Sequence, residues 1–222
     1  MTLLRIDASI LGPISASAEL ADLVVAEWAA ERPDEQVVTR HLGTHPLPPD
    51  AWAVAVDAAH NTPVDQRDAT QRAADALARE LHGELVSADA VVLAFPLYNW
   101  GVSSHVKSWI DLVIAGAVVA GGTAADRVLE GKPVVLLSTR GGSYAAGTPK
   151  EGWDHSTPYL RRILADAWGA DLTVVEREFT LVGLKPELDR FADLGARLKA
   201  TAHEAARAAG KALAAGKALA AG

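Results

Sequence analysis

Short apolar segments alternate with amphipathic segments along most of this 222-residue chain, and this alternation restricts the fold more than any other feature. The apolar segments are rich in Val and Leu and bounded by Gly, Pro or polar residues, which is typical of buried β-strands. They are residues 3–8, 37–42, 90–95, 133–138 and 172–177. Most segments between them repeat apolar residues every three or four positions and therefore predict helices. These are residues 16–31, 63–86, 103–114 and 159–168, with a final helix from residue 186 into the tail, while residues 46–62 are predicted to form a loop.

Strands that alternate with helices form right-handed βαβ crossovers, which give a mostly parallel sheet with helices on both faces. Five strands fit the flavodoxin-like doubly wound order 2-1-3-4-5 better than the six-stranded dinucleotide fold. The predicted fold class is therefore α/β, with a single domain over residues 1–200. Residues 201–222, in which GKALAA occurs twice, are predicted to form a helical extension whose end frays in solvent or binds a partner.

Charge and composition exclude several classes of function. The formal net charge of −7 argues against non-specific nucleic-acid binding, which needs a basic surface. The absence of Cys excludes disulfides, thiolate metal ligands and Cys nucleophiles. The chain begins with a strand-like segment rather than a signal peptide, and no apolar run approaches the roughly 20 residues that span a bilayer. The prediction is a cytoplasmic protein without a membrane or nucleic-acid partner.

The loop after the first predicted strand leads into a helix N-terminus and suits a phosphate group. Free N–H groups and the positive end of the helix dipole attract an anion there, and the hydroxyls of Ser9, Ser15 and Ser17 add donors. The glycine patterns of P-loops and dinucleotide-binding folds are absent. No Lys or Arg lies between Ser9 and Ser17, which favours a monoester phosphate over a triphosphate with magnesium. Capping of the helix by Ser15 or Ser17 explains the same residues equally well.

The third predicted strand stops at Pro96, which has no N–H to donate to a sheet. Leu97, Tyr98, Asn99 and Trp100 follow it directly. A flat aromatic side chain, an amide and free backbone N–H groups suit a planar heterocycle. A flavin is the first candidate for such a ligand.

The fourth predicted strand leads into Thr139, Arg140, Gly141 and Gly142. Adjacent glycines let a ligand approach the backbone closely, and Arg140 supplies a cation beside them. An ordinary strand-end turn is the alternative. In the order 2-1-3-4-5 the first, third and fourth strands are neighbours, so these three loops converge at the switch point, where open α/β sheets bind ligands.

Four short motifs in these loops and beyond them resemble those of a known family, the FMN-dependent NADH azoreductases and their quinone-reductase relatives. The motifs are S-I-L-x-x-x-S-x-S from Ser9, P-L-Y-N-W from Pro96, S-T-R-G-G from Ser138 and T-P-Y-L from Thr157. The resemblance extends from residue 3 to about residue 191. It implies bound FMN, NADH or NADPH as electron donor, an azo compound, quinone or related small molecule as acceptor, and a homodimer that completes the pocket.

The same resemblance assigns roles to individual residues. It implies that the FMN phosphate is held by Ser9, Ser15, Ala16 and Ser17. It further implies that the ribityl chain and the edge of the ring contact Pro96, Leu97, Tyr98, Asn99 and Trp100, and that the polar edge of the ring contacts Thr139, Arg140, Gly141 and Gly142. The chemistry is that of the flavin, so no side chain is named as catalytic.

Residues 115–124 depart from the family, which usually has an arginine and aromatic residues there in a hairpin over the flavin. In this chain the segment is small and uncharged. This departure supports a second hypothesis, a flavin reductase or specialised biosynthetic oxidoreductase that passes reduced FMN or electrons to a partner. A third hypothesis is a flavodoxin-like electron carrier without nicotinamide turnover.

Histidines are candidates both for metal ligands and for substrate contacts. His41 and His45 are four residues apart, but Gly43 and Pro46 disfavour a helix there and no carboxylate cluster completes a site, so no metal is predicted. His105 and His155 lie near the second and third loops and are candidates for substrate contact together with Trp100, with a surface position as the alternative for both histidines.

Overall fold

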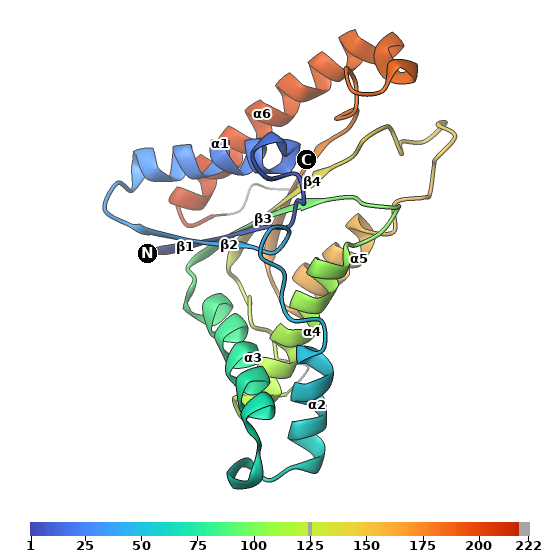
Figure 1. Cartoon of the computed structure of the whole chain (residues 1–222). Coiled ribbons are helices and arrows are strands. Elements are labelled where there is room, and N and C mark those ends of the chain that lie inside the picture. The colour runs from blue at the N-terminus through green and yellow to red at the C-terminus, as the bar shows by residue number, and fades with distance from the viewer. Residues whose placement is uncertain (124–125, 218–222) are drawn as a thin grey trace.

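The computed structural model describes residues 1–123 and 126–217 and contains a five-stranded parallel sheet in the order β2-β1-β3-β4-β5 (Figure 1). This finding confirms the predicted fold class and strand order. The strands are β1 (Thr2–Asp7), β2 (Gln36–His41), β3 (Ala90–Pro96), β4 (Pro133–Thr139) and β5 (Asp171–Arg177).

Alternate side chains of the central strands bury into two separate cores, one on each face of the sheet. In β3, Val91, Leu93 and Phe95 pack into one core, whereas Val92 and Ala94 pack into the other. Every residue of β4 is buried, which explains why its sequence is continuously apolar rather than alternating. Burial on both faces fixes the register, because a shift by one residue would exchange the two sets of side chains.

Among the described residues, two α-helices cover one face of the sheet, and the other α-helices lie on the opposite side (Figure 1). The first pair is α1 (Ala16–Glu31) and α6 (Ala192–Ala214). The second set is α2 (Ala51–Asn61), α3 (Ala69–Ser87), α4 (Ser104–Val119) and α5 (Thr157–Arg161). Within it, α2 packs on α3 and α4.

The predicted loop over residues 46–62 was wrong, because α2 occupies most of it. Its buried residues are the alanines Ala51, Ala55 and Ala58, whose side chains are too small to give a strong apolar periodicity. The next helix begins at Ala69 rather than near residue 63. A capping box between Asp68 and Gln71 fixes that start.

Two other helix boundaries differ from the prediction. Helix α4 continues to Val119, five residues past the predicted end at residue 114, because Ala115, Gly116 and Ala117 are buried. A Cβ on Gly116 would lie 2.1 Å from the carbonyl oxygen of Ala78, so α3 and α4 approach closely at this glycine. The helix predicted at 159–168 is α5 followed by a π-helical turn, Arg162–Ala167.

Helix α6 crosses residue 200 without a break and packs against α1 as far as Ala214. Its buried residues include Ala206, Gly210 and Leu213. The prediction that the first GKALAA repeat frays in solvent was therefore wrong, because its small side chains allow α6 to approach α1. Most of the second repeat lies in 218–222, outside the described residues. In the part of the chain that the structure describes, no helix is long and apolar enough to cross a membrane.

Substitution of the two glycines of α6 tests this helix packing. A Cβ on Gly210 would lie 2.5 Å from the carbonyl oxygen of Val24, whereas one on Gly195 meets nothing closer than 3.4 Å. We expect Gly195→Ala to raise the free energy of unfolding by about 0.5–1 kcal/mol through helix propensity. Gly210→Ala should instead lower it by about 1–3 kcal/mol, because α1 and α6 must separate. Urea denaturation measures both, and stabilisation by Gly210→Ala would contradict the contact.

Candidate functional site

The loops after four of the strands are joined at the carboxyl edge of the sheet by backbone hydrogen bonds that continue past the strand ends. Ala8 N–H donates to the carbonyl of Ala94 at 3.1 Å. Leu97 N–H donates to the carbonyl of Thr139 at 2.9 Å. Arg140 N–H donates to the carbonyl of Arg177 at 2.8 Å. The three predicted loops therefore lie side by side, and the loop after β5 joins them.

The Tyr98 hydroxyl links the first loop to the second. It lies 3.2 Å from the hydroxyl of Ser9 and accepts a hydrogen bond from Ile10 N–H, also at 3.2 Å. The Ser9 hydroxyl in turn accepts from Leu11 N–H at 3.2 Å. These contacts fix the first loop against the residues that follow β3.

The N-terminus of α1 combines a cap with unpaired donors. Ser15 is the N-cap, and its hydroxyl accepts from Ala18 N–H at 3.3 Å and lies 3.0 Å from the hydroxyl of Ser17. The N–H groups of Ala16 and Ser17 precede the first intrahelical bond, and neither donates a hydrogen bond to another of the described residues. Both sequence interpretations are thus compatible, because the capping serine leaves the anion-binding N–H groups free.

An acidic residue near this helix end is neutralised by cations from other elements. Glu19 binds Arg177 at 2.5 Å and Lys199 at 2.8 Å. Burial raises the pKa of Glu19, but the hydrogen bonds from Lys199 and Arg177 outweigh burial and lower the pKa below its ordinary value. Its carboxylate is therefore charged at neutral pH but paired, and it repels an anion at the helix end less than a free carboxylate would.

The second loop forms a strained turn. Gly101 N–H donates to the carbonyl of Tyr98 at 3.0 Å, and the two central residues have positive φ, 49° at Asn99 and 66° at Trp100. Asn tolerates this region, whereas a bulky aromatic residue rarely adopts it. The third loop supports the turn, since His155 N–H donates to the carbonyl of Trp100 at 2.9 Å and Trp153 packs edge-to-face on Trp100. Such strain is concentrated at ligand sites and is held by the surrounding structure.

A cavity of about 390 Å³ opens between the second loop, the third loop and the segment after β5. This volume is within the range of small-molecule sites. Predicted site residues that line it are Leu97, Asn99, Trp100, Gly141 and Gly142. Residues that sequence reasoning missed are Tyr144, Lys150, Leu181, Lys185, Glu187 and Leu188. Their position after the carboxyl ends of β4 and β5 could have identified them from the sequence. The sequence prediction included no residue between Gly142 and His155 and none after β5.

The Arg140 side chain does not line this cavity. It is 7% exposed and binds Asp154 at 2.7 Å, with Glu176 and Glu178 completing a group of three carboxylates. It also donates to the hydroxyl of Thr157 at 3.2 Å. A guanidinium removed from water needs such partners. Arg140 therefore joins the third loop to β5 and to the start of α5 and does not offer its side chain to a ligand.

The other predicted site residues do not line this cavity, and those assigned to the phosphate, Ser9, Ser15, Ala16 and Ser17, are in the first loop and the start of α1. Pro96 and Thr139 are the last residues of β3 and β4, and Thr139 is buried. His155 is exposed and touches the site through its backbone. His105, the second residue of α4, is half-buried and does not line the cavity. Neither histidine side chain is placed in the cavity by the structure.

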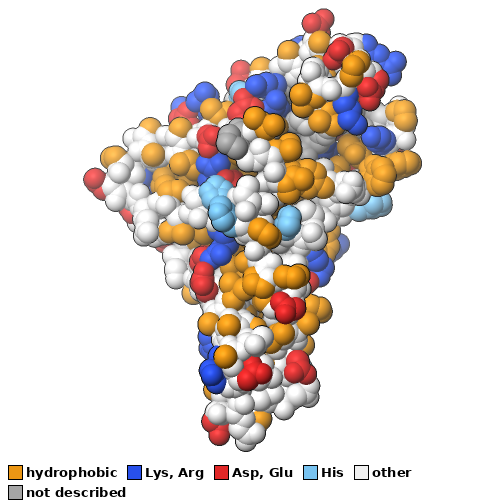
Figure 2. Space-filling model, in the orientation of Figure 1, with side chains coloured by type: hydrophobic (Ala, Val, Ile, Leu, Met, Phe, Trp, Pro, Cys, Tyr) orange, Lys and Arg blue, Asp and Glu red, His pale blue; other side chains and the backbone are white. Residues whose placement is uncertain are grey.

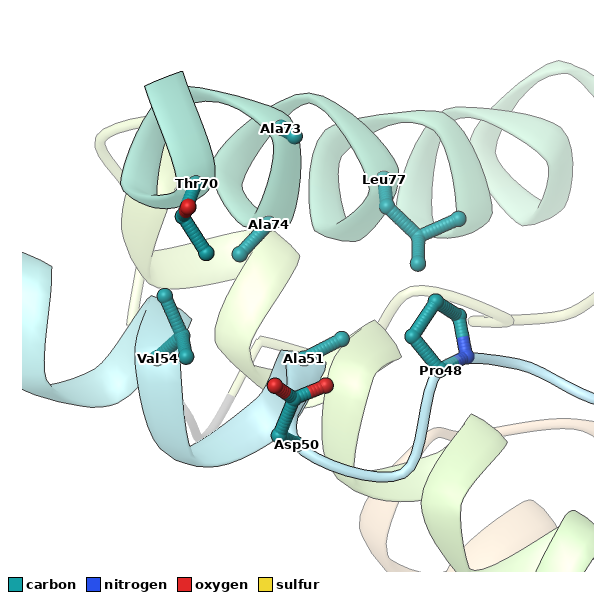
Figure 3. Close-up of a pocket in the computed structure, with 8 residues that line it drawn as sticks. All are labelled: Pro48, Asp50, Ala51, Val54, Thr70, Ala73, Ala74 and Leu77. Carbon is teal, nitrogen blue, oxygen red and sulfur yellow. The ribbon is translucent and has the colours of Figure 1, made fainter. Parts of the chain in front are cut away.

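Two other hollows have different linings. The one in Figure 3, about 200 Å³, lies between α2 and α3, and Asp50 is the single charged residue among its described lining. The other, about 450 Å³, is lined by the first-loop residues Ser9 and Gly12 together with His41 and His45. Arg5 in its lining is already paired with Asp7 and Asp22. Across residues 1–123 and 126–217, no group of three or more His, Cys, Asp or Glu is arranged to hold a metal ion.

The topology and the position of the cavity define the class of protein, a doubly wound α/β protein with a ligand-sized cavity at the carboxyl ends of β3, β4 and β5. The profile of a family described by its flavodoxin-like fold matches residues 1–210. The chain belongs to this flavodoxin-like family and, within it, to the group that contains the FMN-dependent NADH:quinone oxidoreductases.

Two relatives carry that name. The protein of Frankia alni is 38% identical over 206 residues, which cover 93% of this chain and 97% of the relative. The protein of a Parafrankia species is 39% identical over 209 residues, with coverage of 92% and 96%. An azoreductase structure from Bacillus anthracis superposes with a TM-score of 0.73 at 20% identity and covers 95% of this chain and 99% of its own. At that identity the structure supports the fold alone.

The strained turn gives a prediction that needs no ligand. Asn99→Gly should raise the free energy of unfolding or leave it unchanged, because glycine adopts positive φ readily. Asn99→Ala should lower it by about 1 kcal/mol, since alanine does not. Thermal unfolding of the two variants measures the difference. Equal stabilities would contradict the left-handed backbone at this position.

Proposed function

We propose that this chain is an FMN-dependent oxidoreductase that passes reducing equivalents from NADH or NADPH to quinones, azo compounds or related small acceptors. One observation carries the proposal. Residues predicted from two separate motifs line a single cavity at the carboxyl edge of the sheet, in a chain 38–39% identical to FMN-dependent NADH:quinone oxidoreductases over more than nine-tenths of its length.

The first loop and α1 fit a phosphate monoester. The N–H groups of Ala16 and Ser17 and the hydroxyls of Ser15 and Ser17 are within one helical turn. Ser9 is in the same loop, and its hydroxyl lies beside that of Tyr98. The hydroxyls of Ser15 and Ser17 bond to each other and would rotate to donate to an anion. The helix dipole adds a favourable potential without a Lys or Arg.

The second and third loops fit the ribityl chain and the ring. Asn99 offers an amide, and Leu97 and Trp100 offer apolar surface on one wall of the cavity. On the other wall, a Cβ on Gly142 would meet nothing within 4 Å, so a ligand can approach the backbone there. When bound, FMN accepts a hydride from the nicotinamide and delivers it to the acceptor.

The residues of the cavity orient the reactants and supply hydrogen-bond donors. Burial, assisted by Asp154, raises the pKa of Tyr144, so its hydroxyl remains a hydrogen-bond donor in the cavity at neutral pH. The second loop, the third loop and the segment after β5 enclose one open cavity. Entry of donor and acceptor in turn into this cavity gives ping-pong kinetics. Contact of a substrate with Trp100, His105 or His155 remains part of the proposal.

The flavin-reductase alternative depends on one segment of the chain. The small segment at 115–124 suggested an altered loop over the flavin and hence a flavin reductase. Its residues up to Val119 instead continue α4 and pack away from the loops, and Ala124 lies outside the described residues. An electron carrier remains distinguishable, because it would not accept hydride from a nicotinamide.

A homodimer in the cytoplasm is also part of the proposal. Trp52 and Val118, on α2 and α4, are 47% and 41% exposed, and a hollow of about 190 Å³ lies between these two helices. Exposed apolar side chains of this size are typical of interfaces. The nicotinamide donor named for the relatives is an intracellular metabolite, which supports the cytoplasm.

The function is tested by titrating the purified protein with FMN and mixing the complex with NADH in a stopped-flow instrument. We expect flavin absorption bands that bleach within seconds and return on addition of a quinone, and a dimer by sedimentation equilibrium of the same sample. A protein that takes up no FMN would contradict the proposal, and bound FMN that NADH does not bleach would identify an electron carrier.

The variant Asn99→Gly then tests the placement of the cofactor. It removes the amide while keeping the positive φ of the turn, so its fold is retained. We expect its dissociation constant for FMN to rise about fivefold to tenfold, the loss of roughly one hydrogen bond. Unchanged affinity would remove Asn99 from the site.

A further inference from the structure

Two lysines from distant parts of the chain meet at the cavity beside the second loop. Lys150 lies in the segment between β4 and α5, and Lys185 lies after β5. Both are exposed, and neither forms an ion pair with any residue in the described ranges. Lys150 lies over the ring of Tyr144, with its Nζ 5.6 Å from the ring centroid.

Most other lysines are engaged, so these two stand out. Lys107, Lys199 and Lys211 pair with carboxylates, and Lys132 donates to the carbonyls of Leu85 and Val86. Lys217, three residues after the end of α6, is the further described lysine without an ion pair, and it does not line the cavity. The chain as a whole has a net charge of −7, whereas this cavity has two lysines without an ion pair, so the local charge is opposite in sign to that of the chain.

The carboxylates around the cavity are mostly used elsewhere. Glu178 accepts from Tyr144 N–H at 2.9 Å and from Arg140, and Asp154 and Glu176 also bind Arg140. Glu187 is the exception, because it lines the cavity and is exposed. The side chains that line the cavity therefore carry a net charge of about +1, two lysines against one glutamate.

The rest of the lining is apolar and aromatic. Leu97, Trp100, Leu181 and Leu188 form the walls, with the ring of Tyr144 under Lys150. Figure 2 shows Lys and Arg side chains next to hydrophobic ones on this side of the molecule, between the start of α6 and the segment after β4. Such a lining suits a flat apolar ring that carries an anionic group.

We propose that Lys150 and Lys185 are specificity-determining residues that select a reactant with an anionic group. This inference rests on the function proposed above and names the substrate class of the same site. The anionic group has two sources, the diphosphate of the nicotinamide donor or a sulfonate or carboxylate on an aromatic acceptor. Exposed lysines act through a screened field, so their effect depends on ionic strength.

The test uses the holoenzyme and the double variant Lys150→Glu/Lys185→Glu. The control is Lys217→Glu, which applies the same kind of charge reversal at a lysine that does not line the cavity. Ping-pong kinetics yield separate kcat/KM values for NADH, for 1,4-naphthoquinone-2-sulfonate and for neutral 1,4-naphthoquinone. Lys150→Gln and Lys185→Gln, which remove charge without reversing it, should show intermediate effects.

We expect kcat/KM for at least one anionic reactant to fall about tenfold or more in the double variant at low salt, and the loss to shrink as salt rises. A loss confined to NADH assigns the lysines to the diphosphate, and a loss confined to the sulfonate assigns them to the acceptor. The neutral quinone should react as in the unmodified enzyme.

Three results would overturn the inference. One is a double variant that matches the Lys217→Glu control with both anionic reactants. Another is an equal loss with the neutral quinone. A third is a shift in FMN affinity or midpoint potential without a change for the anionic reactants, which would assign the lysines to the cofactor. Failure of the unmodified holoenzyme to bleach with NADH would instead contradict the function proposed above.

Discussion

Parallel register in a sheet buried on both faces is the constraint on which the rest of this structure depends. Because β3 and β4 bury both sets of side chains, their register cannot slip, and the strand ends align at one edge. The ladder then continues beyond the strands through Leu97 to Thr139 and through Arg140 to Arg177. Residues far apart in the sequence thereby become walls of one cavity. The same contacts therefore stabilise the fold and position the residues of the site.

Arg140 extends this constraint to the outer wall of the cavity. Its buried guanidinium binds Asp154, Glu176 and Glu178, which belong to the segment before α5, to β5 and to the residue that follows β5. A buried ion group of this kind contributes little net stability, because desolvation of the charges offsets their attraction. The Arg140 ion group instead fixes the position of the segment between β4 and α5. This segment contains Tyr144 and also Trp153, which packs against the strained turn at Trp100. A residue expected to bind ligand thus acts behind the site.

The sheet and much of the candidate site could be predicted from the sequence, because their signals are local. Strand periodicity and the rule that ligands bind at strand ends were enough to select Asn99, Trp100 and Gly142. Helix α2 was missed because its buried face consists of alanines, and the end of α6 was misjudged because a buried glycine reads as a helix breaker. The direction of the Arg140 side chain and the position of Lys150 and Lys185 at the cavity could not be predicted. Both depend on contacts with distant segments, which a local sequence pattern does not contain.

The most direct measurement of the central claim is a crystal structure of the FMN complex. We expect phosphate oxygens within about 3 Å of the N–H groups of Ala16 and Ser17, with the ring between the turn at Asn99 and the backbone of Gly142. A phosphate bound instead by Arg5, His41 or His45, without contact to the N–H groups of Ala16 and Ser17, would contradict the claim that the N-terminus of α1 holds the cofactor.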